Sequence, residues 1–394
     1  MGPSWIQHNQ YIGGNEVQLL RSGRPFFEAV HACIQKATQT LHVQMYILSA
    51  DETGQQVLRL LLAAAASGVR VYILADAYGS LYLDKSWQET LQQAGVQFRF
   101  FGNAFWQKRS IGRRLHHKII VADNREFILG GLNIANRYND LPGMPAWLDY
   151  AVWVRGPIAQ HAQLRCTQLW NKKRWPRLRA RQEPNPTPVL VRLSANDWLR
   201  GNHEINERLR QAIRHAHQEV LIAAAYFVPT GRILYELKKA ARRGVSVRLL
   251  FGKYSDVGLA LHATRFLYDL LFRSGMHVYE FQKGVLHAKV LLVDSQWASI
   301  GSYNLNYLSA FESLELNIDI ADASFGKQLR LELESVIERD SEKINPVDYF
   351  QKLRVGDRIV NSFSFVLSGT GANFSPFRVF PSIPFNSIQR IGNT

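Results

Sequence analysis

Two short stretches of the chain carry the same reactive side chains in the same order. Residues 115–133 read LHHKIIVADNREFILGGLN, and residues 286–304 read LHAKVLLVDSQWASIGSYN. The shared positions are His116, Lys118, Asp123, Gly130 and Asn133 in the first copy and His287, Lys289, Asp294, Gly301 and Asn304 in the second. Because the whole set is duplicated, we expect one site assembled from two half-sites.

Histidines and lysines in this arrangement could transfer a phosphoryl group without a metal ion. A neutral imidazole is available as a nucleophile near pH 7, and a second histidine facing it can protonate the leaving oxygen and later deprotonate the incoming one. Lys118 and Lys289, with Asn133 and Asn304, could bind the non-bridging phosphate oxygens and neutralise charge that would otherwise require Mg²⁺. The spacing therefore predicts a phosphate-binding site with no metal and no cofactor.

A metal site is the competing interpretation of the first copy, because His116 and His117 are adjacent. The second copy has Ala288 at the position of His117, and no cysteine or acidic cluster accompanies either copy. Zinc sites need three or four nitrogen, sulfur or carboxylate ligands. We therefore expect no metal ligands here.

The apolar residues after each lysine predict how the reactive groups are held. Runs rich in Ile, Val and Leu indicate buried strands, in which side chains alternate between the two faces. His116 and Lys118 therefore share a face. Asp123 lies an odd number of residues from both and points to the other face of a regular strand, as does Asp294 in the second copy. Both aspartates belong to the catalytic motif, and we expect them to be structural.

Two further acids, Asp149 and Glu315, each lie in an apolar strand that follows one copy of the motif. A buried acid needs a polar partner, and a carboxylate that fixes the tautomer of an imidazole is a familiar pair. We expect these acids to orient the histidines. The alternative is that each caps a strand or pairs with an arginine.

Strands and helices are predicted to alternate in the same order in both halves. The first half has strands at 16–20, 41–48, 69–74 and 96–100 and helices at 25–38, 54–67 and 84–94; the second has helices at 204–217, 232–243, 264–274 and 325–339 and strands at 220–227, 245–251 and 276–281. This pattern predicts an α/β fold of two tandem, pseudo-twofold related domains, each a mixed, mainly parallel sheet flanked by helices. We place the domains at 14–184 and 185–345. An aromatic tail at 346–394 either contacts a membrane or packs back on a domain.

The net charge predicts an anionic partner. Lys and Arg number 47 against 32 Asp and Glu, a formal charge of +15, which suits lipid headgroups or nucleic acid. Cys33 and Cys166 have no metal-type spacing, so we expect no disulfide framework and a reducing compartment. No apolar segment approaches the roughly 20 residues that span a bilayer. A cytoplasmic or peripheral protein is expected.

A basic segment at residues 168–188 separates the two halves. It contains Trp170, Lys172, Lys173, Arg174, Trp175, Arg177, Arg179 and Arg181. With tryptophans among the charges it is similar to an interfacial anchor for anionic lipid. The alternative is a solvated charge run that leads into a proline-rich linker.

The paired stretches resemble the HxK(x)4D(x)6G[GS]xN motifs of the phospholipase D superfamily. The chain most resembles its bacterial cardiolipin synthases, in the short form without N-terminal membrane helices, at DAYGS (76–80), LDYAVWVRGPI (148–158), AYFVPTGRIL (225–234) and GSYNLNYLS (301–309). The resemblance implies a covalent phosphatidyl-histidine, with His116 as the nucleophile and His287 as the acid and base. In several members of the superfamily the carboxylate after one motif serves the histidine of the other, which would pair Asp149 with His287 and Glu315 with His116. The sequence itself leaves open which carboxylate serves which histidine.

The resemblance implies transfer of a phosphatidyl group between two phosphatidylglycerol molecules, giving cardiolipin and glycerol. Hydrolysis, or transfer to another alcohol, could use the same intermediate, and the superfamily also includes nucleases. Tryptophans in the basic segment and the lack of a recognised nucleic-acid motif favour lipid over nucleic acid, and two intact motifs weigh against a non-catalytic lipid binder. We expect a peripheral protein on the inner face of a bacterial cell membrane, bound to anionic phospholipid; these patterns set no oligomeric state.

Overall fold

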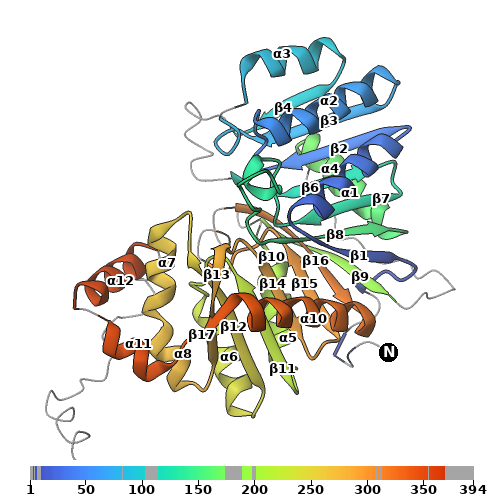
Figure 1. The fold of residues 1–394 in the computed structure, drawn as a ribbon. Coiled ribbons are helices and arrows are strands. Elements are labelled where there is room, and N and C mark those ends of the chain that lie inside the picture. Colours follow the sequence, from blue (N-terminus) through green and yellow to red (C-terminus); the bar gives the residue numbers. More distant parts are fainter. Residues whose placement is uncertain are drawn as a thin grey trace, which may run out of the picture.

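A computed structural model of the chain shows two β-sheets, each with helices packed on its faces (Figure 1). It describes residues 3, 5, 6, 10–81, 83–102, 114–173, 189–197, 201–306, 309, 313–353 and 355–368. The first sheet, in the upper half of Figure 1, comes from the first part of the chain, and the second sheet, in the lower half, comes from the second part.

The first sheet has the strand order β1-β8-β7-β6-β2-β3-β4. Its strands are β1 (Glu16–Arg21), β2 (Thr40–Met45), β3 (Arg70–Asp76), β4 (Gln97–Phe101), β6 (Lys118–Ala122), β7 (Glu126–Gly130) and β8 (Tyr150–Arg155). Its helices are α1 (Arg24–Lys36), α2 (Glu52–Ala66), α3 (Lys85–Gln93), the short η2 (Asn136–Tyr138) and α4 (Ile158–Trp170). Local sequence explains the helix starts: a proline, Pro25, lies in the first turn of α1, and the Asp51 side chain accepts from the Gly54 amide at the start of α2.

The second sheet has the order β10-β9-β16-β15-β14-β11-β12-β13-β17. Its strands are β9 (Leu190–Asp197), β10 (Asn202–His203), β11 (Glu219–Ala224), β12 (Ser246–Tyr254), β13 (His277–Val285), β14 (Lys289–Val293), β15 (Trp297–Gly301), β16 (Ser313–Ala321) and β17 (Ser341–Lys343). Its helices are α5 (Glu204–Arg214), α6 (Gly231–Arg242), α7 (Gly258–Phe266), α8 (Tyr268–Arg273), α10 (Ala323–Asp340), α11 (Pro346–Lys352) and α12 (Val355–Leu367). The single helix predicted at 264–274 is instead the two helices α7 and α8, which meet at Leu267.

The two sheets repeat one topology. The order β1-β8-β7-β6-β2-β3-β4 corresponds strand for strand to β9-β16-β15-β14-β11-β12-β13. Strand β6 with the first motif therefore matches β14 with the second. The prediction of an α/β fold with two tandem domains is confirmed.

The sheets are mixed, but the prediction that they are mainly parallel is wrong. Among the described strands, the parallel pairs are β2–β3, β3–β4, β11–β12, β12–β13 and the short β5 (Arg114–Leu115) with β16. The other neighbours within the two sheets run antiparallel. Parallel neighbours need a crossover, which helices such as α2 and α3 supply. The motif strands β6 and β7 are instead joined by a tight turn in which Asp123 and Asn124 have φ of 54° and 58°.

An apolar core joins the two domains. It contains Ile119 of β6, Val154 of β8, Leu193 of β9, Leu292 of β14 and Ile318 of β16, and it includes residues of α4 and α10. The shared core fixes the two motif strands relative to each other, which a site built from two half-sites requires.

The described part of the aromatic tail packs on the second domain. In α12, Phe365 stacks on Phe266 of α7 with ring centroids 4.6 Å apart, and Asn361 Oδ1 lies 2.8 Å from His262 Nδ1. Other phenylalanines of the tail, Phe374 to Phe385, lie outside the described residues. The domain limits 14–184, 185–345 and 346–394 remain our proposal.

Candidate active site

The two motif histidines lie where the domains meet, and each is held by a main-chain hydrogen bond to the other domain. The His116 amide donates to the Leu314 carbonyl at 2.9 Å, and the His287 amide donates to the Leu148 carbonyl at 2.7 Å. Strand β5, just before His116, pairs with β16, and Leu148 pairs with Leu286 in an isolated bridge. Because Glu315 and Asp149 directly follow the two accepting residues, each carboxylate is carried to the histidine of the opposite domain.

Each histidine ring contacts one of these carboxylates through Nδ1. His116 Nδ1 lies 2.9 Å from Glu315 Oε2, and His287 Nδ1 lies 2.7 Å from Asp149 Oδ2. Both carboxylates are completely buried, with 0% of their residue surface exposed. A buried carboxylate beside Nδ1 favours the tautomer with the proton on Nδ1, which leaves the Nε2 lone pair for chemistry. The structure thus forms the two cross-domain pairs that the resemblance implied.

Small residues make room for the carboxylates. A Cβ added to Gly131 would lie 2.4 Å from Asp149 Oδ1, so this carboxylate needs a glycine beside it. At the equivalent position of the second motif, the Ser302 hydroxyl donates to Glu315 Oε2 and accepts from the Leu316 amide at 3.0 Å. The G[GS] element of the motif therefore fits and fixes the acid that serves each histidine.

The two lysines are buried next to the histidines. Lys118 Nζ donates to the His116 carbonyl at 2.8 Å, and Lys289 Nζ donates to the His287 carbonyl and lies 3.4 Å from Asp149 Oδ2. Burial lowers the pKa of both lysines, and the buried carboxylates oppose this shift. An arriving phosphate anion would favour the charged lysines further.

The two asparagines differ in their contacts. Asn133 Oδ1 accepts from the Ile47 amide at 3.0 Å, and its Nδ2 donates to the Tyr138 hydroxyl at 2.8 Å. The Tyr138 hydroxyl in turn lies 3.5 Å from His287 Nε2. Asn304 Oδ1 is buried with no hydrogen-bond partner among the described residues. The half-sites are therefore not identical, and a tyrosine borders His287.

The motif aspartates bind backbone amides rather than the histidines, and we propose a structural role for them although they belong to the catalytic motif. Asp123 accepts from the amides of Thr38, Gln39 and Thr40 at 2.7–2.8 Å. Asp294 accepts in the same way from residues 217–219. The lysines are the first residues of β6 and β14 and the aspartates directly follow the last residues, so the two lie at opposite ends of each strand. They anchor the start of β2 and β11, which is the structural role expected from side-chain alternation.

The family is identified by comparison with known proteins. A family model described as cardiolipin synthase, PLD-like domain, matches residues 30–161 and 209–337, which together make up most of the chain. The chain belongs to this family. The resemblance that the motifs indicated is thereby confirmed.

Relatives in the cardiolipin synthase family match most of this chain. Cardiolipin synthase B of Escherichia coli K12 is 35% identical over 341 residues, which cover 84% of this chain and 83% of that protein. Cardiolipin synthase of Geobacillus sp. WCH70 is 32% identical over 364 residues, covering 90% of this chain and 72% of that protein. Among solved structures, phosphatidylserine synthase of Haemophilus influenzae Rd KW20 has a TM-score of 0.69 over 92% of this chain and 96% of that chain, at 16% identity, which shows a shared fold.

Aromatic residues around the histidines of this cardiolipin synthase family member were not identified from the sequence. The Tyr46 ring packs edge-on against His116 with centroids 4.8 Å apart, and the Tyr226 ring packs edge-on near His287 at 6.4 Å. Both follow equivalent strands, β2 and β11. Alignment of QMYIL with AAYFV across the repeat was the signal that could have found them. The Trp147 ring centroid lies 6.1 Å from that of His287, and the sequence repeat gave no sign of this residue.

Burial keeps both histidines neutral near pH 7. It lowers the pKa of His116 from 6.5, against the opposing charge of Glu315. Burial, with Lys289 next in effect, lowers the pKa of His287 to about 4, although Asp149 acts to raise it. Each free site therefore presents a neutral imidazole.

Other predicted features lie outside this site. His117 points into the interior, where its Nδ1 lies 2.9 Å from Gln44 Oε1, and the described residues contain no group of three His, Cys, Asp or Glu side chains that could hold a metal. In the basic segment, the Trp170 ring packs under the guanidinium of Arg99 from β4, which lies 3.6 Å from the ring centroid. Lys172 and Lys173 of the segment are exposed. Its other charged residues and Trp175 lie outside the described ranges. No described helix is long and apolar enough to cross a membrane.

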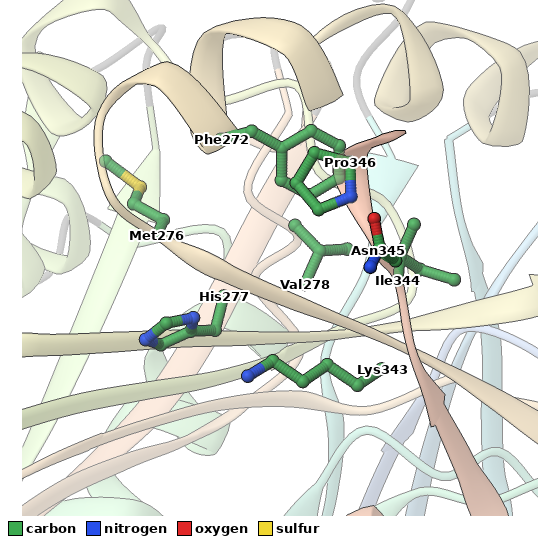
Figure 2. Close-up of a pocket in the computed structure, with 8 residues that line it drawn as sticks. All are labelled: Phe272, Met276, His277, Val278, Lys343, Ile344, Asn345 and Pro346. Carbon is green, nitrogen blue, oxygen red and sulfur yellow. The ribbon is translucent and has the colours of Figure 1, made fainter. Parts of the chain in front are cut away.

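A separate cavity of about 400 Å³ lies in the second domain (Figure 2). It is bordered by α8, the start of β13 and the connection from β17 to α11, and its lining includes Phe272, His277 and Lys343. None of the predicted site residues lines it. The chemistry therefore belongs to the domain interface rather than to this cavity.

Proposed function

We propose that this chain is a cardiolipin synthase that transfers a phosphatidyl group from one phosphatidylglycerol molecule to another and releases glycerol. The supporting observation is the pair of histidines at the domain interface, each bound through Nδ1 to a buried carboxylate of the other domain. The names of its relatives in Escherichia coli and Geobacillus agree with this assignment. We further propose that it works as a peripheral protein on the inner face of a bacterial cell membrane.

In the first step, His116 Nε2 attacks the phosphorus of one phosphatidylglycerol. The described residues form no hydrogen bond to this nitrogen, whereas the Tyr138 hydroxyl lies 3.5 Å from His287 Nε2; this difference supports His116 as the nucleophile. The P–O bond to glycerol breaks as the P–N bond forms, and His287 donates its Nε2 proton to the departing oxygen. The anionic phosphodiester beside His287 raises its pKa from about 4 and so favours the proton-carrying form that this step needs.

In the second step, a hydroxyl of the second phosphatidylglycerol attacks the phosphatidyl-histidine. Its proton passes to Nε2 of His287, the new P–O bond forms, and the P–N bond to His116 breaks. Lys118 and Lys289, with Asn133 and Asn304, bind the non-bridging oxygens, and Glu315 and Asp149 stabilise the positive charge that develops on each ring. The products are cardiolipin and glycerol, and both histidines return to their starting states.

Mass spectrometry of the lipid products tests this function. The purified chain incubated with phosphatidylglycerol vesicles should form cardiolipin and glycerol in equal amounts. Phosphatidic acid as the main product would make the enzyme a phospholipase D hydrolase, and a product formed only with another added alcohol would change the acceptor. Cleavage of DNA without any lipid product would replace the assignment with a nuclease.

Chelation should leave the rate unchanged. Because the lysines and asparagines are proposed to neutralise the phosphate, no divalent cation is required at the reacting phosphorus. Cardiolipin formation should proceed at the same rate with and without EDTA. Loss of activity in EDTA that Mg²⁺ or Zn²⁺ restores would contradict the roles given to the lysines.

The acidic limb of the pH profile of kcat/KM should lie below pH 6.5. His116 must be neutral to attack, and burial lowers its pKa from 6.5. The loss of activity caused by protonation of His116 should therefore set in only below pH 6.5, whereas the opposite limb belongs to His287, which must carry a proton. Initial rates on detergent-dispersed phosphatidylglycerol between about pH 4 and 8 measure this limb. A limb at or above 6.5 would show that the histidine is not held neutral by burial.

A further inference from the structure

Large apolar side chains are exposed mainly in two neighbouring places in the described part of the chain. One set comprises Tyr78, Leu81 and Met144 of the first domain and Tyr254, Val257 and Leu259 of the second, which lie from the end of β12 to the start of α7. The other set lies on α12 and comprises Ile359, Val360, Phe363, Val366 and Leu367. Exposed apolar groups that gather in one region usually mark a surface that contacts an apolar phase or a partner.

The loops near the histidines are equivalent in the two domains. One follows β3 and carries Tyr78 and Leu81, and the other follows β12, the matching strand, and carries Val257. The two loops therefore occupy equivalent positions in the two domains. The exposed apolar residues therefore come from both domains.

Each loop also has an aspartate, at or just after the end of the preceding strand, that hydrogen-bonds a neighbour of a motif histidine. At the end of β3, Asp76 Oδ2 accepts at 2.8 Å from the amide of Leu115, the neighbour of His116. In the second domain, the Tyr226 hydroxyl, whose ring packs near His287, donates to Asp256 Oδ1 at 2.6 Å. The exposed apolar residues thus lie one to five positions along the chain from groups bound to the site.

Helix α12 extends this surface with an unusual distribution of side chains. Its polar Asn361 and Ser364 are buried, Asn361 against His262 of α7. Ile359, Phe363 and Val366, at helical spacing i, i+4 and i+7, face outward, and the first two are 64% and 65% exposed. A surface helix that only packs on α7 would place these apolar residues inward. Helices α7 and α12 lie side by side in Figure 1. The outer face of α12 is therefore close to α7, which follows the loop that carries Val257.

We propose that this surface, formed by the two loops and the outer face of α12, docks on an anionic lipid bilayer. Positive charge accompanies it, because the Arg114 guanidinium lies 4.3 Å over the Tyr78 ring and Lys253 Nζ lies 5.7 Å over the ring of the exposed Tyr254. The chain carries a net charge of +15, which attracts it to an anionic surface over about a Debye length. Apolar side chains that insert among headgroups and cations that pair with phosphates are the two parts of interfacial binding.

Docking at this place would present the histidines to the lipid headgroups. This consequence rests on the proposed function, because a phosphatidylglycerol headgroup must pass from a bilayer to the two histidines. The surface would also explain why Ile359, Phe363 and Val366 of α12 are exposed. Binding to vesicles requires no chemistry, so the docking surface can be tested apart from catalysis.

The test compares two double variants of the full chain. Ile359→Ser/Phe363→Ser removes two outward side chains of α12. Tyr235→Ser/Leu331→Ser is the matched control, because these residues on α6 and α10 are similarly exposed, at 57% and 72%, but lie outside the surface. Partition onto phosphatidylglycerol/phosphatidylcholine vesicles is measured by flotation. We expect at least a tenfold loss for the α12 variant, equivalent to about 1.4 kcal/mol, and little change for the control.

Three outcomes would overturn the docking proposal. They are equal partition of the two variants, no vesicle binding by the unaltered chain, and a dimer that only the α12 variant dissociates, which would make a second copy the occupant. Turnover of detergent-dispersed phosphatidylglycerol separates docking from catalysis, since the α12 variant should lose more activity on vesicles than on dispersed lipid. If vesicle binding falls as expected while no form makes cardiolipin, docking stands and the proposed reaction fails.

Discussion

His116→Ala should lower cardiolipin formation by at least about a thousandfold, because removing the nucleophile of a catalytic unit disables the whole unit. His287→Ala should cost about 10²–10⁴, the contribution of a general acid and base. The two effects should be far from additive in the double variant. These effects are measured as initial rates of the two single variants and the double variant on detergent-dispersed phosphatidylglycerol.

The adjacent histidine supplies a matched control. His117 is buried beside His116 but contacts Gln44, and the equivalent position in the second motif is already an alanine, Ala288. His117→Ala should therefore keep the rate within about tenfold of the unaltered chain. Acid-quenched enzyme should carry a phosphatidyl group on His116, found by peptide mass spectrometry. Near-normal turnover by His116→Ala would show that His116 is not the nucleophile. A lipid adduct on His287 alone would reverse the roles of the two histidines.

The sequence predicted the site better than the sheets around it. The duplicated motif placed His116 and His287 in one site because a repeat of reactive residues at constant spacing is rarely structural. Side-chain alternation also separated Asp123 from Lys118. Its premise of a regular strand failed, since β6 ends at Ala122 and Asp123 has a positive φ, yet the carboxylate still faces away from the site.

Strand direction could not be predicted from local patterns. A buried apolar strand gives the same hydrophobic run whether its neighbour is parallel or antiparallel, so alternating helices and strands suggested a mainly parallel sheet. The direction is decided by the connections: a tight turn after Ala122 makes a hairpin, and helices between β2, β3 and β4 make crossovers. Contacts between the domains, such as Leu148 with Leu286, depend on the packed interface and leave no periodic signal.

The cross-domain arrangement makes each half-site incomplete alone. A histidine from one domain receives its carboxylate from the other because the backbone bonds of His116 to Leu314 and of His287 to Leu148 fix the registers. Duplication therefore gives two similar groups in different surroundings: Tyr138 lies beside His287, whereas Ser302 hydrogen-bonds the acid of His116. This difference allows one histidine to act as nucleophile and the other as acid and base.

The carboxylates should act on kcat rather than on KM. Asp149→Asn and Glu315→Gln keep the shape of each side chain but remove the charge that stabilises an imidazolium and selects the Nδ1-protonated tautomer. Each should lower kcat by about 10²–10⁴, with KM changed by no more than about threefold, since neither carboxylate is proposed to touch substrate. Asp149→Asn should also move the pKa of His287 further down, because Asp149 acts to raise it. Steady-state kinetics over a pH series separate these effects.

Two further variants make this expectation specific. Gly131→Ala would place a Cβ 2.4 Å from Asp149 Oδ1, so it should displace the carboxylate and reproduce the kcat loss of Asp149→Asn. Asp319→Asn is the control, because it changes a buried acid on the same strand as Glu315 but away from both histidines. Burial raises the pKa of Asp319, so an uncharged amide is a mild replacement there. For this variant kcat should stay within about tenfold of the unaltered chain. If Asp149→Asn and Glu315→Gln raised KM while leaving kcat intact, the carboxylates would be substrate-binding groups instead of partners of the histidines.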